Sequence, residues 1–420
     1  MDRRASSRSP RPDPRLEAAA GSKLPYSRHV DSSTLSLRDG RLMQVIQLQG
    51  FPFETADSAE LNYRKTVRDT MLRGIANSRF ALYHHVVRRE VSVQLDGAFP
   101  DAFSADLDAQ WKARLAGRKL YTNELFLTLI RRPPQGRVGW VQSLIGGLGA
   151  AVDSAEADAG LARELGALDA ARDALLSSLE PYGARLLTTY RGRAGRCSEP
   201  LEFLSLLYNG ELRPVLESEG DIGAYLPRRR VSFGADALEL SPAGELDRRF
   251  GAMISVKDYP SHTTPGMLDD LLRLPVEMVL SESFAFVDRQ ATLDRMNLSL
   301  RRMRAADDEA RSLRLDLDTA KDDVAAGRSA FGEHHLSVMV LAGDRAALDL
   351  AAADVTTAFT ELGVIAVRED LNLEAAYWAQ FPGNFKYIAR RALVSTGNFA
   401  SLASGHNFPL GQSSGAHWGT

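Results

Sequence analysis

The order of apolar segments, repeated in the two halves of the chain, restricts the possible folds more than any other feature of the sequence. In the first half, alternating apolar residues at 41–48 predict a strand, and apolar residues at every fourth position predict a helix over about 58–77. The following segments predict, in chain order, a β-rich run at 80–93, a buried strand at 124–130, a long helix that ends before Pro181 and a strand at 185–190.

The second half repeats that order. Its segments predict a strand at 251–257, a helix that begins at Thr264 and Pro265 and continues through Leu272, strands at 278–286 and 336–342, a helix capped by Asp344 and a strand at 364–368. The strand at 278–286 has an imperfect apolar face, because Glu282 falls on it. The shared order is that of a split βαβ or ferredoxin-like unit. We therefore predict an α+β fold of two tandem ferredoxin-like lobes with helical insertions.

The two predicted insertions differ in character. In the first lobe, Phe103, Leu107, Trp111 and Leu115 recur at four-residue spacing, which places them on one face of a short helix. In the second lobe, a helical segment at about 289–326 carries a few apolar residues among many Arg and Asp residues. This segment is either an arm or hairpin that binds a partner or a solvated charged helix. The sequence leaves both interpretations open.

Changes in composition suggest where the domains begin and end. The first 23 residues are rich in Arg, Ser and Pro and have no apolar run, which predicts a disordered basic tail rather than a secretory signal. The predicted units are the tail at 1–23, an N-terminal α+β lobe at 24–195, a helical connector at 196–246, a second α+β lobe at 247–394 that includes the arm at about 289–326, and a final segment at 395–420.

Composition excludes several classes of protein. With 44% hydrophobic and 25% charged residues among 420, the chain can bury a sizeable core. A formal net charge of −3 lacks the basic excess of a dedicated nucleic-acid-binding protein. The single cysteine, Cys197, can form neither an internal disulfide nor a multi-cysteine zinc site, which favours a reducing compartment. The longest low-charge stretch, at 141–152, is shorter than the ~20 apolar residues that span a bilayer.

The sequence contains no convincing catalytic or cofactor motif. No G-x-x-x-x-G-K-[ST] string is present, and the cluster of Gly146, Gly147 and Gly149 lacks the third glycine of a dinucleotide fingerprint, so packing or loop glycines are the favoured interpretation. Two histidine pairs, at 84–85 and 334–335, suggest a metal site. Adjacent residues of a strand point to opposite faces, so each pair offers one imidazole to a given site, and ordinary strand or loop histidines are favoured.

Three further groups of residues have side chains that occur in catalytic or binding sites. Cys197 precedes a predicted helix start at Ser198, but no nucleophile signature surrounds it, so an inert cysteine is favoured. Glu369 and Asp370 end a predicted strand, where solvated loop acids are commoner than catalytic ones. Each arginine cluster is short and is balanced by nearby acids, which predicts a solvated surface at 88–89, 131–132, 228–230, 301–302 and 390–391. We assign no catalytic, cofactor-binding or metal-ligating residue.

A set of short motifs resembles the CagE/TrbE/VirB family of type IV secretion and conjugation ATPases. The resemblance covers everything after about residue 23 and is most specific in the segment EAAYWAQFPGN at 374–384. The other matching motifs are Leu24-Pro25-Tyr26, His29-Val30, Arg88-Arg89, Asn123-Glu124, Ser198-Glu199, Phe203-Leu204, VSFG at 231–234, KDYP at 257–260, PGMLD at 265–269, Arg368 to Asp370, Asn398-Phe399-Ala400, His406 to Pro409 and His417-Trp418-Gly419.

The resemblance implies the N-terminal and central part of a larger protein in which a RecA-like motor follows. ATP and Mg²⁺ binding in that motor need a P-loop and a Walker B acid, and neither is present here. The expected function is that of a truncated secretion ATPase, an assembly region that docks on inner-membrane channel subunits without hydrolysing ATP. The expected location is cytoplasmic and peripheral on the inner membrane. Oligomers and contacts with full-length ATPase copies are further expectations.

The alternative is half of a split ATPase that forms a working motor with a separately encoded C-terminal half. Direct nucleic-acid binding ranks below both hypotheses, because no basic, aromatic-lined groove is visible in the sequence. In the family, the segment 395–420 leads into the motor. We therefore expect Phe399, Phe408 and Trp418 to lack a packing surface, and proteases to trim the chain beyond about Val394.

Overall fold

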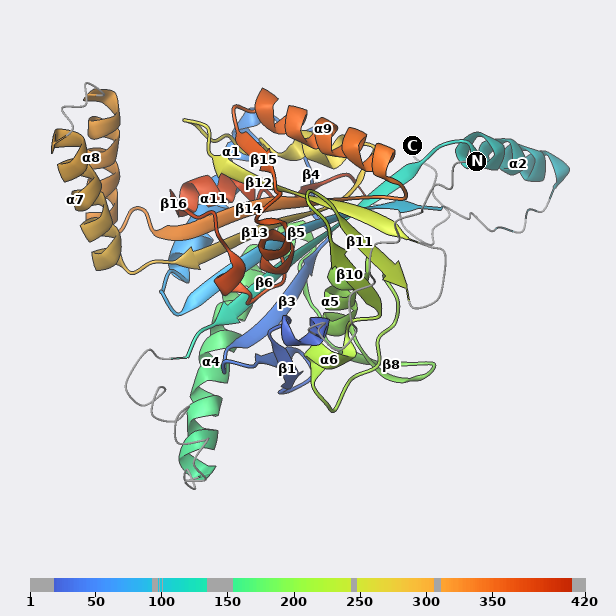
Figure 1. Cartoon of the computed structure of the whole chain (residues 1–420), viewed down its shortest axis with the longest axis horizontal. Helices are drawn as coiled ribbons and strands as arrows, with labels where there is room; N and C mark the ends of the chain where they lie inside the picture. The colour runs from blue at the N-terminus through green and yellow to red at the C-terminus, as the bar shows by residue number, and fades with distance from the viewer. Residues whose placement is uncertain are drawn as a thin grey trace, which may run out of the picture.

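The computed structural model describes residues 19–92, 97, 99, 101–133, 154–242, 248–305 and 311–409, with masked side chains at 154–158 and next to 306–310. Within these residues, helices pack on a large, mostly antiparallel sheet (Figure 1). The main path through the sheet is β1-β2-β3-β6-β5-β13-β14-β12-β11-β10, with β7, β15 and β16 attached to β3, β12 and β14. The predicted mixture of helices and sheet is confirmed in this form.

The first half contributes one side of this sheet. Asp57 caps the first helix by accepting the Glu60 N–H, as the sequence pattern predicts. The elements are η2 (Ala20–Ser22), β1 (Tyr26–His29), β2 (Thr34–Leu37), β3 (Leu42–Leu48), β4 (Phe51–Pro52), α1 (Ser58–Gly74), β5 (Phe80–Val91), α2 (Ala102–Ala116), β6 (Leu120–Arg131), α4 (Ser154–Ser178), η3 (Glu180–Tyr182) and β7 (Arg185–Leu186). Their order from the edge inward is β7-β3-β6-β5, apart from β1 and β2.

The second half contributes the other side. Its elements are β12 (Arg249–Asp258), η4 (Asp269–Arg273), β13 (Glu277–Phe286), α7 (Arg289–Ala305), α8 (Arg311–Ala325), β14 (Phe331–Ala342), α9 (Arg345–Glu361) and β15 (Ile365–Arg368). They are ordered β15-β12-β14-β13 in the sheet. Asp344 caps α9 by accepting the Ala347 N–H, as predicted.

One predicted helix of this half is wrong. Instead of a helix from Thr264 and Pro265 through Leu272, the chain turns and forms only the 3₁₀ segment η4. Gly266 has a φ of +73°, in the left-handed region, so an α-helix cannot run through it. A Cβ at this position would lie 2.2 Å from the Asp269 carboxylate. The tight turn therefore brings Asp269 close to the backbone instead of extending the helix.

The predicted connector is built into the fold. Strand β8 (Thr189–Gly192) lies just before it and β9 (Gly195–Ser198) at its start. The connector itself holds α5 (Glu199–Asn209), α6 (Ile222–Tyr225), β10 (Arg229–Phe233) and β11 (Leu238–Pro242). The single strand predicted at 185–190 is instead split between β7 and β8, which pair with different strands. Ser198 caps α5 as predicted, by accepting the Leu201 N–H. Strands β10 and β11 extend the sheet beyond β12.

The two halves meet at the pairing of β5 with β13. Ala81 lies opposite Ala285 at one end of this antiparallel ladder, and Arg88 lies opposite Met278 at the other. The sheet is thus continuous through both halves. Two apolar clusters cover its faces: one holds side chains of α1, α4 and α9 with Phe399 and Leu402, and the other holds side chains of α5 with Tyr377 and Trp378.

The C-terminal segment, here residues 373–407, crosses back over both halves. Its elements are α10 (Leu373–Ala379), η5 (Phe385–Tyr387), β16 (Ala392–Ser395), α11 (Thr396–Leu402) and β17 (His406–Asn407). The expectation that Phe399 lacks a packing surface is wrong, because this side chain is 2% exposed and stacks on Phe284 with ring centroids 4.6 Å apart. Phe408 is half-buried against the same cluster, and Trp418 lies outside the described residues.

The two helical insertions project from opposite ends of the sheet (Figure 1). Helix α2 follows β5, and the α7–α8 hairpin follows β13, so the antiparallel pairing of these strands sends the insertions in opposite directions. The predicted arm at about 289–326 is therefore a helical hairpin. Among the residues with assigned positions, no helix is both long and apolar enough to cross a membrane.

Candidate functional site

A buried polar centre lies where the two halves join. Glu282 of β13 is 0% exposed and sits between β5 and β14. One carboxylate oxygen, Oε1, is 3.0 Å from Nδ1 of His84, which lies directly opposite in β5. The other, Oε2, is 3.2 Å from Nε2 of His334 in β14. The Tyr259 hydroxyl lies 2.7 Å from Nδ1 of the same His334 ring.

The hydrogen bonds assign protons in this centre. Burial raises the pKa of the Glu282 carboxyl, but the hydrogen bonds from His334 and His84 outweigh burial and bring the pKa below its usual value. Burial also raises the pKa of Tyr259, so its hydroxyl remains a donor. The ionised Glu282 can only accept, so Nε2–H of His334 donates to it, and the Tyr259 hydroxyl hydrogen-bonds to Nδ1 of the same ring. An ionised carboxylate is thus held in the core by two imidazole donors.

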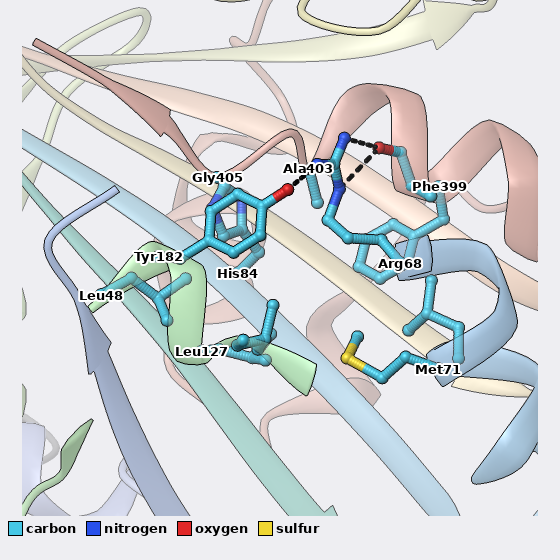
Figure 2. A pocket seen from close by; sticks show the side chains of 12 residues that line it. Leu48, Arg68, Met71, His84, Leu127, Tyr182, Phe399, Ala403 and Gly405 are labelled. Carbon is cyan, nitrogen blue, oxygen red and sulfur yellow. Dashed lines mark hydrogen bonds between the residues drawn. The ribbon is translucent and has the colours of Figure 1, made fainter. Parts of the chain in front are cut away.

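His84 also borders a small cavity (Figure 2). The cavity holds about 30 Å³, and its walls include Arg68, Tyr182 and Phe399. Arg68 donates to the Tyr182 hydroxyl and, at 3.0 Å, to the Ala400 carbonyl. The Nε2 atom of His84 has no hydrogen-bond partner in the described part of the chain. The space suits a water molecule and is far too small for a nucleotide.

The second histidine of each pair points to the opposite face of the sheet, as strand geometry requires. His85 Nε2 lies 2.8 Å from the Gln380 carbonyl oxygen, and His335 Nδ1 lies 2.8 Å from the Arg390 carbonyl oxygen. Burial lowers the pKa of both imidazoles to about 4, so both are neutral donors at pH 7. These two bonds attach the C-terminal segment at 380–390 to the sheet.

The histidine pairs therefore do not form a metal centre in this structure. One nitrogen of each of the four rings is used for Glu282 or for a backbone carbonyl. Among the described residues, no group of three or more His, Cys, Asp or Glu side chains is arranged to hold a metal ion. The pairs are nevertheless more than isolated strand histidines, because two of them share one buried carboxylate.

The other candidate residues have structural surroundings. Cys197 is a buried free thiol in β9, with Sγ 3.8 Å from the Gly195 carbonyl oxygen. Glu369 is not a solvated loop acid, because it is buried with its Oε1 2.8 Å from Nε of Arg390. Asp370, next to it, is exposed. The glycine cluster at 146–149 lies outside the described residues.

The prediction of solvated arginine clusters is wrong for several members. Arg88 is buried and donates to Asn123, and Arg131 is buried and pairs with Glu164. Arg229 is buried and pairs with Glu211. Such cations hold loops and strands together. Arg301 and Arg302, on α7, are exposed as predicted.

One feature of the sequence indicates the polar centre. Glu282 interrupts an otherwise apolar strand face, and a charge in such a position requires a buried partner. The partners come from β5 and β14, which are 198 and 52 residues away in sequence. Residue spacing within a strand does not reveal which strand lies beside it, so the three side chains could not be placed together from sequence.

Comparison with known families gives two matches. Residues 185–390 match the CagE, TrbE, VirB family, described as a component of the type IV transporter system. Residues 33–138 match the N-terminal domain of the type IV secretion system ATPase VirB4/TrbE. The first match spans the connector, most of the second half and both histidines of the second pair. The second match spans the first half from β2 to β6.

Individual relatives agree with these matches. The chain is 37% identical to the type IV secretion system protein virB4 of Bartonella henselae over 398 residues, which are 94% of this chain and 50% of that protein. It is 33% identical to protein virB4 of Agrobacterium tumefaciens, covering 94% of this chain and 49% of that protein. It is 32% identical to the type IV secretion system protein PtlC of Bordetella pertussis, covering 96% and 49%. The chain thus spans about half the length of these relatives.

Proposed function

Because the chain belongs to the CagE/TrbE/VirB family of type IV secretion ATPases, we propose that it is the assembly region of such an ATPase. In this role it binds inner-membrane subunits of the secretion apparatus from the cytoplasmic side and supports secretion or conjugal transfer. The observation that carries the proposal is the family match across both halves, joined to a fold with two projecting helical insertions.

We also propose that the two halves are related ferredoxin-like lobes, approximately 24–195 and 247–394, joined by the 196–246 connector. When the four core strands of each half are numbered along the chain, both halves have the order 4-1-3-2 in the sheet. Each half also carries its helical insertion between strands 2 and 3. The second half departs from the pattern, because the 3₁₀ segment η4 stands where the first helix would be.

The α7–α8 hairpin is the proposed docking arm. Met296 and Leu300 are buried, so much of the apolar surface of α7 is used within the protein. The outward side of α7 carries the exposed residues Leu298, Arg301 and Arg302. A basic surface around a leucine suits an acidic cytoplasmic segment of a membrane subunit. Peripheral placement at the membrane then follows from the partner.

Docking can be tested by co-expressing the chain with defined inner-membrane subunits of its own secretion system and purifying them in detergent. We expect the wild-type chain to co-purify, and a variant with residues 289–326 replaced by a short Gly-Ser linker to be lost from the complex. Leu350→Gln, which changes an exposed leucine of α9, is the matched control and should still bind. Retention of the arm-deleted variant would reject the arm, and failure of the wild type to bind any subunit would reject the docking role.

We further propose that this region does not hydrolyse ATP by itself. The 420 residues contain no G-x-x-x-x-G-K-[ST] string, and phosphoryl transfer in P-loop ATPases needs that loop and its lysine. A phosphate-release assay on the pure chain is expected to match a heat-inactivated control. Mg²⁺-dependent turnover above that control would contradict the proposal.

The alternative is half of a split ATPase that forms a working motor with a separately encoded C-terminal half; the chain spans about half the length of these relatives. Its test is to read the neighbouring downstream frame for the missing P-loop string and to mix the two purified proteins. ATP turnover that appears only in the mixture would support the two-chain motor. The docking experiment is independent of this result.

A further inference from the structure

Helix α2 exposes a continuous apolar stripe. Phe103 is 77% exposed, and Leu107 and Trp111 are each 53% exposed. Leu115, one turn further on, is half-buried. The four-residue spacing places these side chains on one face. In the part of the chain with assigned positions, no side chain of α2 is buried, so the helix projects without using this face for packing (Figure 1).

The charges of α2 are divided between its two halves. From 101 to 110 the only charged residues are acidic, and from 111 to 119 they are all basic: Asp101, Asp106 and Asp108, then Lys112, Arg114, Arg118 and Lys119. One pair, Lys112 and Asp108, forms an ion pair within the helix. The helix therefore presents an apolar stripe whose first half is bordered by negative charge and whose second half is bordered by positive charge.

We propose that α2 is a self-association element that pairs antiparallel with α2 of a second copy of this chain. In that arrangement the acidic half of each helix lies against the basic half of the other, whereas a parallel pair would place like charges together. The two-fold axis lies near position 109. Leu107 of each copy then lies beside the partner's Trp111, and Phe103 lies beside the partner's Leu115.

The same features argue against two other occupants. An anionic membrane surface attracts amphipathic helices whose polar borders are rich in Lys and Arg. Asp106 and Asp108 lie on either side of the stripe near Leu107 and would face that surface. An unrelated protein need not carry charges complementary to both halves of α2. A second copy in antiparallel orientation does, because its basic half lies against the acidic half and its acidic half against the basic half. A two-fold contact also uses each side chain twice.

The self-association is expected to be weak and reversible. A contact between two 15-residue helices buries much less than the ~1,200 Å² of a stable interface. Sedimentation velocity of the full chain over a concentration series should therefore show a monomer–dimer equilibrium. Trp111→Gln should raise the dimer Kd by at least about tenfold, because aromatic side chains at the centre of an interface dominate binding. Leu350→Gln is the matched control and should leave the Kd unchanged.

Cross-linking tests the direction of pairing. A mixture of Leu107→Cys and Trp111→Cys chains should form an intermolecular disulfide under mild oxidation, and Leu107→Cys alone should form much less. Wild-type chain, whose single cysteine is buried, is the background control. A dominant Leu107→Cys homodimer would instead indicate parallel pairing and would overturn the proposal.

Charge exchange tests whether the charges beside the stripe contribute to the pairing, whereas the direction of pairing is tested by the cross-linking. The variants Asp106→Lys/Asp108→Lys and Lys112→Glu/Arg114→Glu should each dimerise more weakly than wild type, and an equimolar mixture should recover a heterodimer. A wild-type chain that stays monomeric at every concentration, or binding of wild type but not Trp111→Gln to anionic vesicles, would also reject self-association. Failure of subunit docking through α7–α8 would not affect these results, because α2 lies at the other end of the sheet.

Discussion

Glu282 places a negative charge in the buried centre of the sheet, and hydrogen bonds from two imidazoles of neighbouring strands stabilise this charge. Burial alone would neutralise the carboxyl, whereas the donors at His84 and His334 keep it ionised. The centre contributes specificity as well as stability, because a shift of either neighbouring strand by one residue would move its histidine to the other face. Glu282 therefore fixes the register of β5 and β14 at the junction of the two halves.

We predict that Glu282→Ala lowers the free energy of unfolding by about 3 kcal/mol, because it leaves two buried donors without an acceptor. Urea denaturation followed by circular dichroism measures the loss. Ser281→Ala is the matched control in the same strand, and its cost should be below about 1 kcal/mol because the Ser281 hydroxyl has no partner in the described part of the chain. Equal losses in the two variants would show that the centre is not stabilising.

A second residue-scale prediction concerns pH and His85. Its folded pKa is lowered from 6.5 to about 4, so between these values the unfolded chain binds a proton that the folded chain does not. Stability is fully present above pH 6.5 and falls as the pH drops toward 4, by about 3 kcal/mol from this residue. The urea midpoint of His85→Gln should depend less on pH in this window. His262→Gln, at an exposed position, should keep the wild-type dependence.

At the scale of elements, local signals predicted the structure well and distant contacts did not. The caps at Asp57, Ser198 and Asp344 were predictable because a cap involves residues three positions apart. The prediction of a helix after Thr264 was wrong because Gly266 has a left-handed backbone conformation. The Thr-Pro pattern indicates a helix start but gives no information about this turn. The exposed end expected after Val394 failed because the surface that buries it comes from α1 and β13, far away in the sequence.

The C-terminal segment gives a prediction at this scale. Phe399→Ala should lower the free energy of unfolding by about 3–4 kcal/mol, because it removes a buried ring from the core. Limited proteolysis should leave residues 395–408 intact in the wild type and cut there first in the variant. Asn398→Ala, at the exposed neighbouring position, is the control and should behave like wild type. Rapid trimming of the wild type near Val394 would contradict this packing.

At the scale of the whole molecule, the two halves anticipated from the sequence share one sheet. The pattern of apolar segments predicted strands and helices along each half, but not the pairing of β5 with β13, because the residues of one strand do not reveal which strand lies beside it. The polar centre depends on the same pairing, because it brings His84 next to Glu282. The sequence alone therefore showed only two separate histidine pairs and a glutamate on an apolar strand face. The pairing of β5 with β13 and the polar centre were both missed because each depends on contacts between residues far apart in the sequence.

This continuity predicts cooperative unfolding. Leu127→Ala in β6 and Val340→Ala in β14 both remove core side chains, one from each half. Each variant should shift one common urea transition to lower concentration without changing its slope. Intrinsic fluorescence and circular dichroism should report the same midpoint. Two separate transitions, each sensitive to a mutation in only one half, would show that the halves unfold independently.

The opposed insertions also have a mechanical consequence. Neighbours that pull on α2 and on the α7–α8 hairpin would pull β5 and β13 along their own lengths in opposite directions. Antiparallel hydrogen bonds lie across the strands, so such a load stretches the whole ladder in shear instead of opening it one bond at a time. We predict that stretching a single molecule between these insertions ruptures it at higher force than stretching it between its two ends. The junction of β5 and β13 is therefore suited to carrying a load between the two insertions.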